Sequence, residues 1–159
     1  KYYHLVNGFN SRLDAIQAAV LEVKLRHLGD WLSARKILAA RYADGLRSAH
    51  GIAAPSVRAE ADHVFNYYTV RVQGGKARRD ALAQELKTRG VSTAVYYPVS
   101  LHLQQVYRNL GHQTGSFPES ERAQDEVLSL PMCPFIGETQ SRYVVESVCD
   151  AASRLHWSG

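Results

Sequence analysis

Two strong hydrogen-bonding side chains, Asn10 and Arg12, stand two residues apart in the sequence, just before an apolar-striped segment. The segment is predicted to be helical, and the first turn of a helix offers unpaired backbone N–H groups and the positive end of the helix dipole. An amide and a guanidinium at such a place are suited to hold an anion. The alternative is that Asn10 or Ser11 merely caps the helix while Arg12 lies exposed on the surface.

A second group of chemically capable side chains surrounds Pro98. Tyr96, Tyr97 and His102 lie where a predicted strand, residues 91–98, ends at the proline. Side chains at the end of a strand often face a cleft, which makes these residues candidates for a site. The alternative is aromatic packing beneath a loop. The preceding tyrosine pair, residues 67 and 68, is predicted to belong to the core and the sheet surface instead.

Several kinds of reaction centre are not indicated. The seven histidines are scattered, and none pair at metal-ligand spacing on one helix face. Cys133 and Cys149 form no Cys-x-x-Cys motif, so neither a zinc site nor a disulfide framework is predicted, and a reducing cytoplasm is the expected compartment. Walker, Gly-x-Gly-x-x-Gly and Gly-x-Ser-x-Gly motifs do not occur. We therefore predict no metal site and no nucleophile of these known types.

Length and composition restrict the class of protein further. At 159 residues and 45% hydrophobic composition, the chain can bury a core of its own. The net charge of +4 is mild and its basic clusters are interrupted, so nucleic acid is not a predicted partner. Without a run of about 18 apolar residues or a secretory leader, a membrane is not predicted either. Because the chain starts at Lys1 and its single methionine is Met132, we expect an internal piece of a longer protein.

Helix and strand signals predict an α+β architecture, with a small antiparallel or mixed sheet covered by helices. Leu13, Ile16, Val20 and Val23 recur at helical spacing, and alanines on a neighbouring face indicate that this helix is contacted on more than one side. Asp30 is the predicted N-cap of a second helix. Further helices are predicted at 76–89, 101–109, 116–128 and 139–155, and strands at 63–73 and 91–98.

Several segments, in the same order along the chain, together resemble one protein family. The most specific reads Gly-x-Asn-Ser-Arg-Leu-Asp-x-x-Gln-Ala-Ala-x-Leu-x-x-Lys-Leu, residues 8–25. It is followed by Trp31, Arg35, Arg41 and Tyr42, and by the stretches 67–72, 91–104, 116–121 and 128–131. Over nearly its whole length the chain resembles the C-terminal part of the DegT/StrS group of nucleotide-sugar aminotransferases, which depend on pyridoxal 5'-phosphate (PLP).

This resemblance implies a fold and a domain organisation. It implies a fold-type I PLP enzyme, of which the chain is the C-terminal small α+β domain preceded by long connecting helices. Residues 1–50 would then hold the connecting and interface helices with the Gly-x-Asn-x-Arg motif, and residues 51–159 would form the small domain. Such enzymes are homodimers, and each active site is built from both subunits.

The resemblance also implies roles for single residues. Asn10 matches the asparagine that reaches the PLP phosphate of the partner subunit, and a phosphate dianion is well held by neutral donors. Arg12 matches the arginine that points toward the anionic or hydroxyl groups of the sugar nucleotide. Tyr96 and His102 match substrate-lining positions, although Tyr96 stands where the family often has histidine, and Ser100 stands where proline is usual.

The implied reaction moves an amino group, usually from glutamate, to a keto-sugar carried on dTDP or UDP, with PLP as the electron sink. The family's Schiff-base lysine precedes the Gly-x-Asn-x-Arg motif, and none of the lysines here, at 1, 24, 36, 76 and 87, lies in that context. We therefore expect no catalytic residue in this chain, and no activity from it alone. Two alternatives stay open: a PLP-dependent sugar dehydratase of the same family, and a non-catalytic dimerisation or regulatory module.

Overall fold

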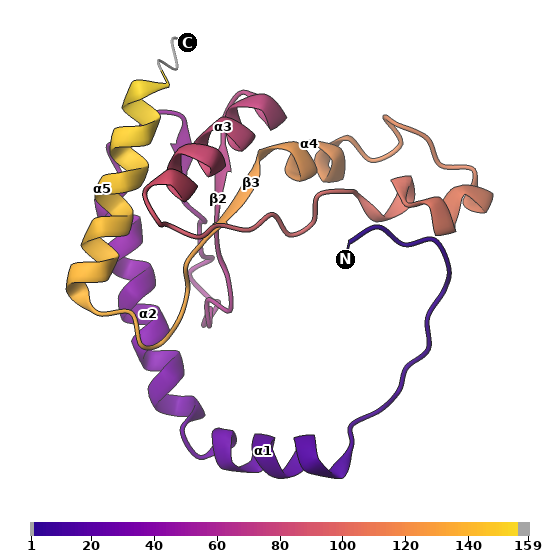
Figure 1. Ribbon diagram of the computed structural model, residues 1–159, viewed down its shortest axis with the longest axis horizontal. Coiled ribbons are helices and arrows are strands. Elements are labelled where there is room, and N and C mark those ends of the chain that lie inside the picture. The colour runs from indigo at the N-terminus through magenta and orange to yellow at the C-terminus, as the bar shows by residue number, and fades with distance from the viewer. Residues whose placement is uncertain (1, 156–159) are drawn as a thin grey trace.

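The computed structural model describes residues 2–155, in which helices and strands follow an irregular N-terminal arm, residues 2–14 (Figure 1). In chain order the elements are α1 (Ala15–Leu25), α2 (Leu28–Gly45), β1 (Ile52–Ala53), β2 (Tyr68–Val72), α3 (Gly75–Thr88), the 3-10 turns η1 (Leu101–Leu103) and η2 (Gln105–Leu110), α4 (Pro118–Glu126), β3 (Val127–Leu130) and α5 (Glu138–Arg154). The last four residues of the predicted small domain lie outside the described part of the chain.

The sheet has three strands in the order β1–β2–β3, and both pairings are antiparallel. Along β2 the side chains of Tyr68, Val70 and Val72 are buried, whereas Thr69 and Arg71 between them are partly exposed. This alternation is what the two-residue period of a strand produces when one face of a sheet is covered. The predicted α+β fold, a small antiparallel sheet with helices, is confirmed.

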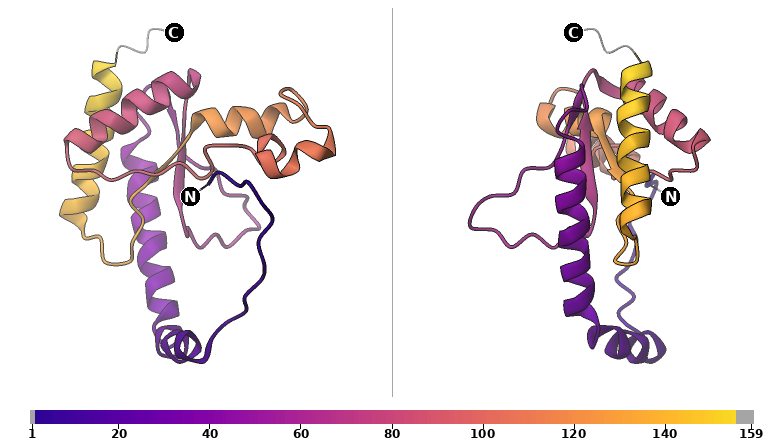
Figure 2. Two further views of the ribbon diagram at one scale, coloured as in Figure 1. Left: turned by 45° about the vertical axis from the view of Figure 1, so that its right-hand side comes forward. Right: turned by 90° about the vertical axis from the view of Figure 1, so that its left-hand side faces the viewer.

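The core lies between the sheet and three helices, and α2 and α5 run side by side along it (Figure 2). Each helix contributes fully buried side chains: Leu38 and Tyr42 from α2, Leu82 and Leu86 from α3, and Val148 from α5. Burying one such large apolar side chain stabilises a fold by about 1.5–3 kcal/mol. The C-terminal half of α2 therefore shares a core with the sheet, while the domain boundary at residue 50 stays a prediction.

Two helix boundaries differ from the predicted ones. The N-cap of α1 is Asp14, whose carboxylate accepts a hydrogen bond from the backbone N–H of Gln17 at 2.8 Å. Helix α2 begins at Leu28, so Asp30 lies inside its first turn and is not its cap. An acidic side chain is favourable there because it faces the positive end of the helix dipole. The prediction of Asp30 as an N-cap was wrong because α2 already begins at Leu28.

The predicted strands were wrong in extent, because pairing partners far along the chain decide where a ladder forms. Of residues 63–73 only Tyr68–Val72 pairs, and its second neighbour is β3, a strand that was not predicted. Residues 91–98 contribute only an isolated bridge between Ala94 and Ser129. The predicted helix at 101–109 is instead two 3-10 turns, divided at Gln104, whose backbone is extended.

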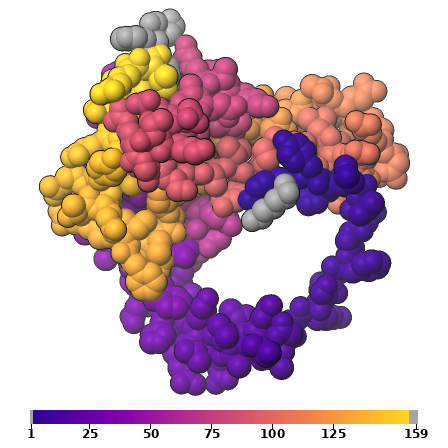
Figure 3. Space-filling view, in the orientation of Figure 1, coloured from indigo at the N-terminus to yellow at the C-terminus, as the bar shows by residue number. Residues whose placement is uncertain are grey.

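The arm and α1 stand away from the core (Figures 1 and 3). No residue of α1 is buried, and the side chains of Phe9, Ile16 and Val23 are 98%, 80% and 55% exposed. A contiguous apolar surface of this kind is typical of an interaction site. Contacts on several sides of α1 therefore stay a prediction. None of the helices in residues 2–155 combines the length and apolar character that crossing a membrane requires.

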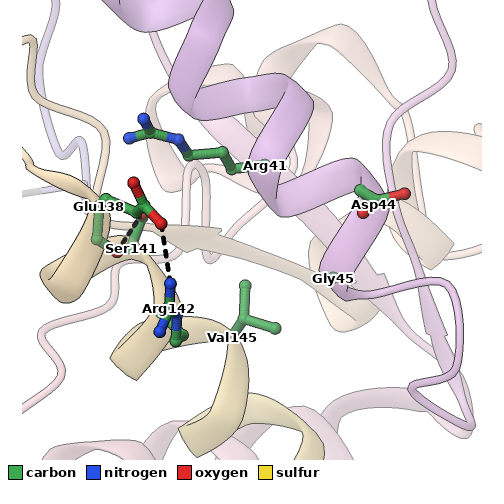
Figure 4. Close-up of a pocket in the computed structure, with 7 residues that line it drawn as sticks. All are labelled: Arg41, Asp44, Gly45, Glu138, Ser141, Arg142 and Val145. Atoms are coloured by element: carbon green, nitrogen blue, oxygen red, sulfur yellow. Dashed lines mark hydrogen bonds and ion pairs between the residues drawn. The ribbon is translucent and has the colours of Figure 1, made fainter.

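Helices α2 and α5 approach closely at Gly45, the last residue of α2, next to a hollow of about 210 Å³ (Figure 4). A Cβ atom added at Gly45 would lie 2.6 Å from Cγ1 of Val145, and a β-branched side chain cannot easily turn aside. We expect Gly45→Ala to lower the free energy of unfolding by about 1 kcal/mol, because overpacking outweighs the gain in helix propensity. Urea denaturation followed by circular dichroism measures this change.

Gly29→Ala is the matched control for Gly45→Ala. Gly29 lies in the first turn of the same helix, and an added Cβ there would meet nothing within 4 Å. Gly29→Ala should raise the free energy of unfolding by about 0.5–1 kcal/mol, because alanine has the higher helix propensity and its Cβ meets no neighbouring atom. Equal shifts for the two variants, in either direction, would contradict the close approach of α2 and α5.

Candidate functional site

The arm places Asn10 and Arg12 in a tight turn just before α1. The side-chain oxygen of Asn10 accepts a hydrogen bond from the backbone N–H of Arg12 at 3.1 Å, and the φ angle of Arg12 is 66°. Asparagine often forms such side-chain-to-backbone turns, and this one supports Arg12 in a left-handed conformation that few non-glycine residues adopt. The sequence thus builds a fixed local turn from the two predicted site residues.

Both side chains keep their donors free. Because Asp14 caps α1, the alternative in which Asn10 or Ser11 is the cap is wrong. The Asn10 amide N–H₂ and the Arg12 guanidinium make no hydrogen bond or ion pair within residues 2–155, and both residues are exposed. Since the Asp14 carboxylate already occupies the N-terminus of α1, an anion would be held by these two side chains rather than by the helix itself.

This turn fits part of a phosphate-binding site. A neutral amide and a guanidinium offer several N–H donors, and the one acceptor among them, the side-chain oxygen of Asn10, is already bonded to the backbone N–H of Arg12. Two side chains on one turn approach a phosphate from one side only and do not surround its three free oxygens. The remaining donors would have to come from elements outside the arm.

Tyr96 lies in an aromatic cluster rather than alone in a cleft. Its ring centroid is 4.5 Å from that of Tyr67 and 6.1 Å from that of Tyr2, and the ring of Tyr97 is 6.0 Å from Tyr2. Tyr67 and Tyr96 also line a hollow of about 270 Å³, whose wall includes the polar residues Asn66, Ser92, Thr93 and Ser129. The two readings of Tyr96, packing and exposure to a hollow, are thus both present.

His102 is held by a hydrogen bond to a carboxylate of the same chain. Its side chain is 7% exposed, and its Nε2 lies 2.9 Å from Oε1 of Glu121. The carboxylate of Glu121 also accepts hydrogen bonds from the backbone N–H groups of Gly115 and Phe117. The bond from Gly115, aided by that from His102, holds the pKa of Glu121 below its ordinary value against the opposing effect of burial. His102 therefore braces the loop before α4.

One edge of the His102 ring still borders an open space. A hollow of about 400 Å³ is lined by this histidine together with Leu101, Tyr107, Leu110, His112, Phe117 and Ser120. The ring of Phe117 packs edge-on against His102 at 4.9 Å. The wall is mainly apolar, so a ligand contact by His102 would come from the ring edge that Glu121 leaves free.

The four predicted site residues do not meet within one chain. No hydrogen bond, ion pair or ring contact among residues 2–155 joins Asn10 or Arg12 to Tyr96 or His102. The beginning of the arm lies beside Tyr96, whereas the part that carries Asn10 and Arg12 leads away to α1 (Figure 1). Within residues 2–155 the two pairs are therefore not in direct contact.

Sequence reasoning missed Gln104 and Glu121. Gln104 is a buried polar residue with 4% exposure, and its amide binds the main chain of the arm. Glu121 organises the loop before α4. The available signal for Gln104 was its place in the segment His-Leu-Gln, residues 102–104. A partner about 100 residues away in the chain could not be inferred from that segment.

None of the described lysines lies beside the predicted site residues. Lys36 pairs with Asp62, and Lys24, Lys76 and Lys87 are exposed on helices. Lys1 lies outside the described residues. Among the side chains that the structure describes, no group of three or more histidine, cysteine, aspartate or glutamate residues gathers to hold a metal ion.

Residues 1–149 match the model of one protein family, the DegT/DnrJ/EryC1/StrS aminotransferase family. The chain belongs to this family. The match covers the turn with Asn10 and Arg12 as well as the sheet and most of α5. The resemblance based on the motif at residues 8–25 is thereby confirmed.

Individual members of the family are similar over almost the whole chain. The pleiotropic regulatory protein of Geobacillus stearothermophilus is 46% identical over 152 residues, which cover 94% of this chain and 40% of that protein. The dTDP-3-amino-3,4,6-trideoxy-alpha-D-glucose transaminase of Streptomyces venezuelae is 40% identical over 155 residues, covering 98% of this chain and 40% of that enzyme. The chain thus spans about 40% of the length of these relatives.

The fold agrees with a solved structure of the family. The crystal structure of S. venezuelae DesV in complex with a ketimine intermediate superposes with a TM-score of 0.84 and 40% sequence identity. The match covers 97% of this chain and 40% of that one. The arm, the small sheet and the covering helices together therefore form a known part of an aminotransferase fold.

Proposed function

We propose that this chain is the C-terminal part of a PLP-dependent aminotransferase that acts on a nucleotide-linked keto-sugar. The observation that supports it most is the 40% identity to the dTDP-sugar transaminase of S. venezuelae across 98% of the chain. The free donors of Asn10 and Arg12 add a chemical reason, since the substrate and the cofactor both carry phosphate. The amino donor is proposed to be glutamate, the sugar carrier dTDP or UDP, and the compartment the cytoplasm.

The proposed protein is a homodimer with shared active sites. The apolar surface of α1, with Ile16 and Val23 more than half exposed, would be covered by the rest of the intact chain and by the second subunit. The separation of Asn10 and Arg12 from Tyr96 and His102 supports an active site assembled across the interface. One chain would then supply the arm, and the other would supply the remaining elements.

Each residue has a defined part in this proposal. Asn10 donates its amide N–H₂ to the PLP phosphate of the partner subunit, and Arg12 binds the anionic or hydroxyl groups of the sugar nucleotide. Tyr96 and the free edge of His102 border the substrate, while Glu121 fixes the ring of His102. PLP, when bound, supplies the electron sink. The lysine that forms the Schiff base belongs to the part of the protein before Lys1.

Transamination by the intact protein tests the proposal. With PLP, glutamate and a dTDP- or UDP-linked keto-sugar, we expect mass spectrometry to show an amino-sugar nucleotide and an equal amount of 2-oxoglutarate. Residues 1–159 alone should produce neither, because none of their lysines lies in the Schiff-base context. PLP fixed by borohydride on one of these lysines would contradict the predicted inactivity. An intact sequence without a lysine and a phosphate-binding loop ahead of Lys1 would contradict the enzymatic proposal.

The name of the Geobacillus relative, a pleiotropic regulatory protein, favours one alternative, a non-catalytic regulatory module. Salt-dependent binding of the intact protein to nucleic acid, unaffected by PLP or sugar nucleotide, would support it. A PLP-dependent sugar dehydratase is the other alternative. It would consume the keto-sugar nucleotide without forming an amino-sugar nucleotide, so the same assay separates it from an aminotransferase.

A further inference from the structure

Gln104 is a buried polar side chain that binds the main chain of the arm at two points. Its Nε2 donates a hydrogen bond to the carbonyl oxygen of Tyr2 at 2.7 Å, and its Oε1 accepts one from the backbone N–H of His4 at 3.0 Å. A backbone bond from Val106 to the carbonyl oxygen of His4, 3.2 Å long, lies alongside. The amide thus clamps residues 2–4 much as a neighbouring strand would.

The clamp depends on the local backbone. Gln104 separates η1 from η2 and is itself extended, and its side chain is buried between these two short 3-10 turns. At 4% exposure an unpaired amide would be costly, and this one is satisfied by the arm and by a longer contact to the carbonyl oxygen of Val99. Gln104 binds main-chain groups of the arm. The clamp therefore fixes the position of the arm and does not recognise any particular side chain on it.

Aromatic contacts reinforce the same point on the arm. The ring of Tyr2 packs edge-on against Tyr96 and Tyr97, at 6.1 and 6.0 Å between centroids. Figure 3 shows the start of the arm resting against the body while the stretch toward α1 stands clear. Between His4 and Asp14, no hydrogen bond, ion pair or ring contact that the structure describes ties the arm to the core.

We propose that Gln104 is a positioning residue that sets where the arm leaves the small domain, and thereby where Asn10 and Arg12 reach. The arm has two fixed ends, the clamp at residues 2–4 and the start of α1, and the Asn10–Arg12 turn lies between them. Releasing the first end frees the turn to sample other positions. The effect of Gln104 on the site rests on the proposed function, whereas the contact between Gln104 and the arm does not.

The test compares Gln104→Glu with Gln105→Glu in the intact protein. Gln104→Glu retains an acceptor for His4 but places a carboxylate against the carbonyl oxygen of Tyr2, where a donor is needed. Gln105 is exposed, so the same change there is a matched control. Gln104→Met, which removes the hydrogen bonds without adding a charge, is the second variant in case the carboxylate prevents folding.

Two measurements follow the arm and the site separately. Amide hydrogen exchange, read by mass spectrometry on peptides that cover the backbone N–H groups of His4 and Val106, should become about tenfold faster in both Gln104 variants and stay unchanged in the control. The KM for the sugar nucleotide should rise about tenfold, with kcat changed by less than about threefold, because the turn is misplaced but not removed.

Each outcome decides a different claim. Unchanged exchange in folded Gln104 variants would overturn the clamp. Faster exchange with an unchanged KM would overturn the positioning role. An intact wild-type protein that does not transaminate contradicts the proposed function alone, since amide exchange reports on the arm with or without PLP.

Discussion

Replacing Asn10 by aspartate in the intact protein is expected to weaken retention of PLP by roughly 10- to 100-fold, the effect of losing a charge-assisted hydrogen bond. Aspartate retains the oxygen that accepts from the backbone N–H of Arg12, so the local turn is preserved. It loses the amide donors and adds a negative charge that repels phosphate. Equilibrium dialysis or the absorbance of PLP that remains after gel filtration measures the loss.

Asn10→Ala removes the donor and the support of the turn together. Alanine removes the donor and also the bond that supports the positive φ of Arg12, so it should weaken PLP retention and raise the KM for the sugar nucleotide as well. Arg12→Ala should mainly raise that KM. Ser11→Ala, at an exposed neighbour, is the control and should behave as wild type. If Asn10→Asp and Arg12→Ala both behaved as wild type, the roles carried over from the family would be wrong.

Replacing Arg79 by methionine is expected to lower the free energy of unfolding by about 2–4 kcal/mol. The side chain of Arg79 is 3% exposed, and its guanidinium donates to the carbonyl oxygens of Gln124 and Val127 at 3.0 and 3.3 Å. It thereby ties α3 to the point where α4 ends and β3 begins. Methionine fills a similar space but leaves these carbonyl groups without a donor.

Lys76→Met is the matched control for Arg79→Met, since it makes the same kind of change at an exposed position in the first turn of α3. It should change the free energy of unfolding by less than about 0.5 kcal/mol. Urea denaturation gives both values, and equal slopes against urea concentration exclude a change in the unfolded state. A shift for Arg79→Met as small as that of the control would show that the guanidinium is not a structural tie.

The α-helices were predictable because their signals are local, although the helix predicted at 101–109 is two 3-10 turns. Val144, Val148 and Ala152 recur every four residues, and all three are buried on the inner face of α5. The strands were less predictable because their pairing is not local. The segment 127–130 was assigned in part to a helix, yet it becomes β3 because β2 offers it a complete antiparallel ladder, with Val70 opposite Leu128.

The sequence by itself determined the family and the chemistry of the arm. The motif at residues 8–25 places an amide and a guanidinium two residues apart, and the turn that presents them forms from its own neighbours. Tertiary structure decided which other polar side chains remain free. His102 meets Glu121 and Gln104 meets the start of the arm only after segments up to about 100 residues apart come together. Contacts between residues so far apart in the sequence depend on the packing of the whole core, and a local sequence pattern therefore cannot predict them.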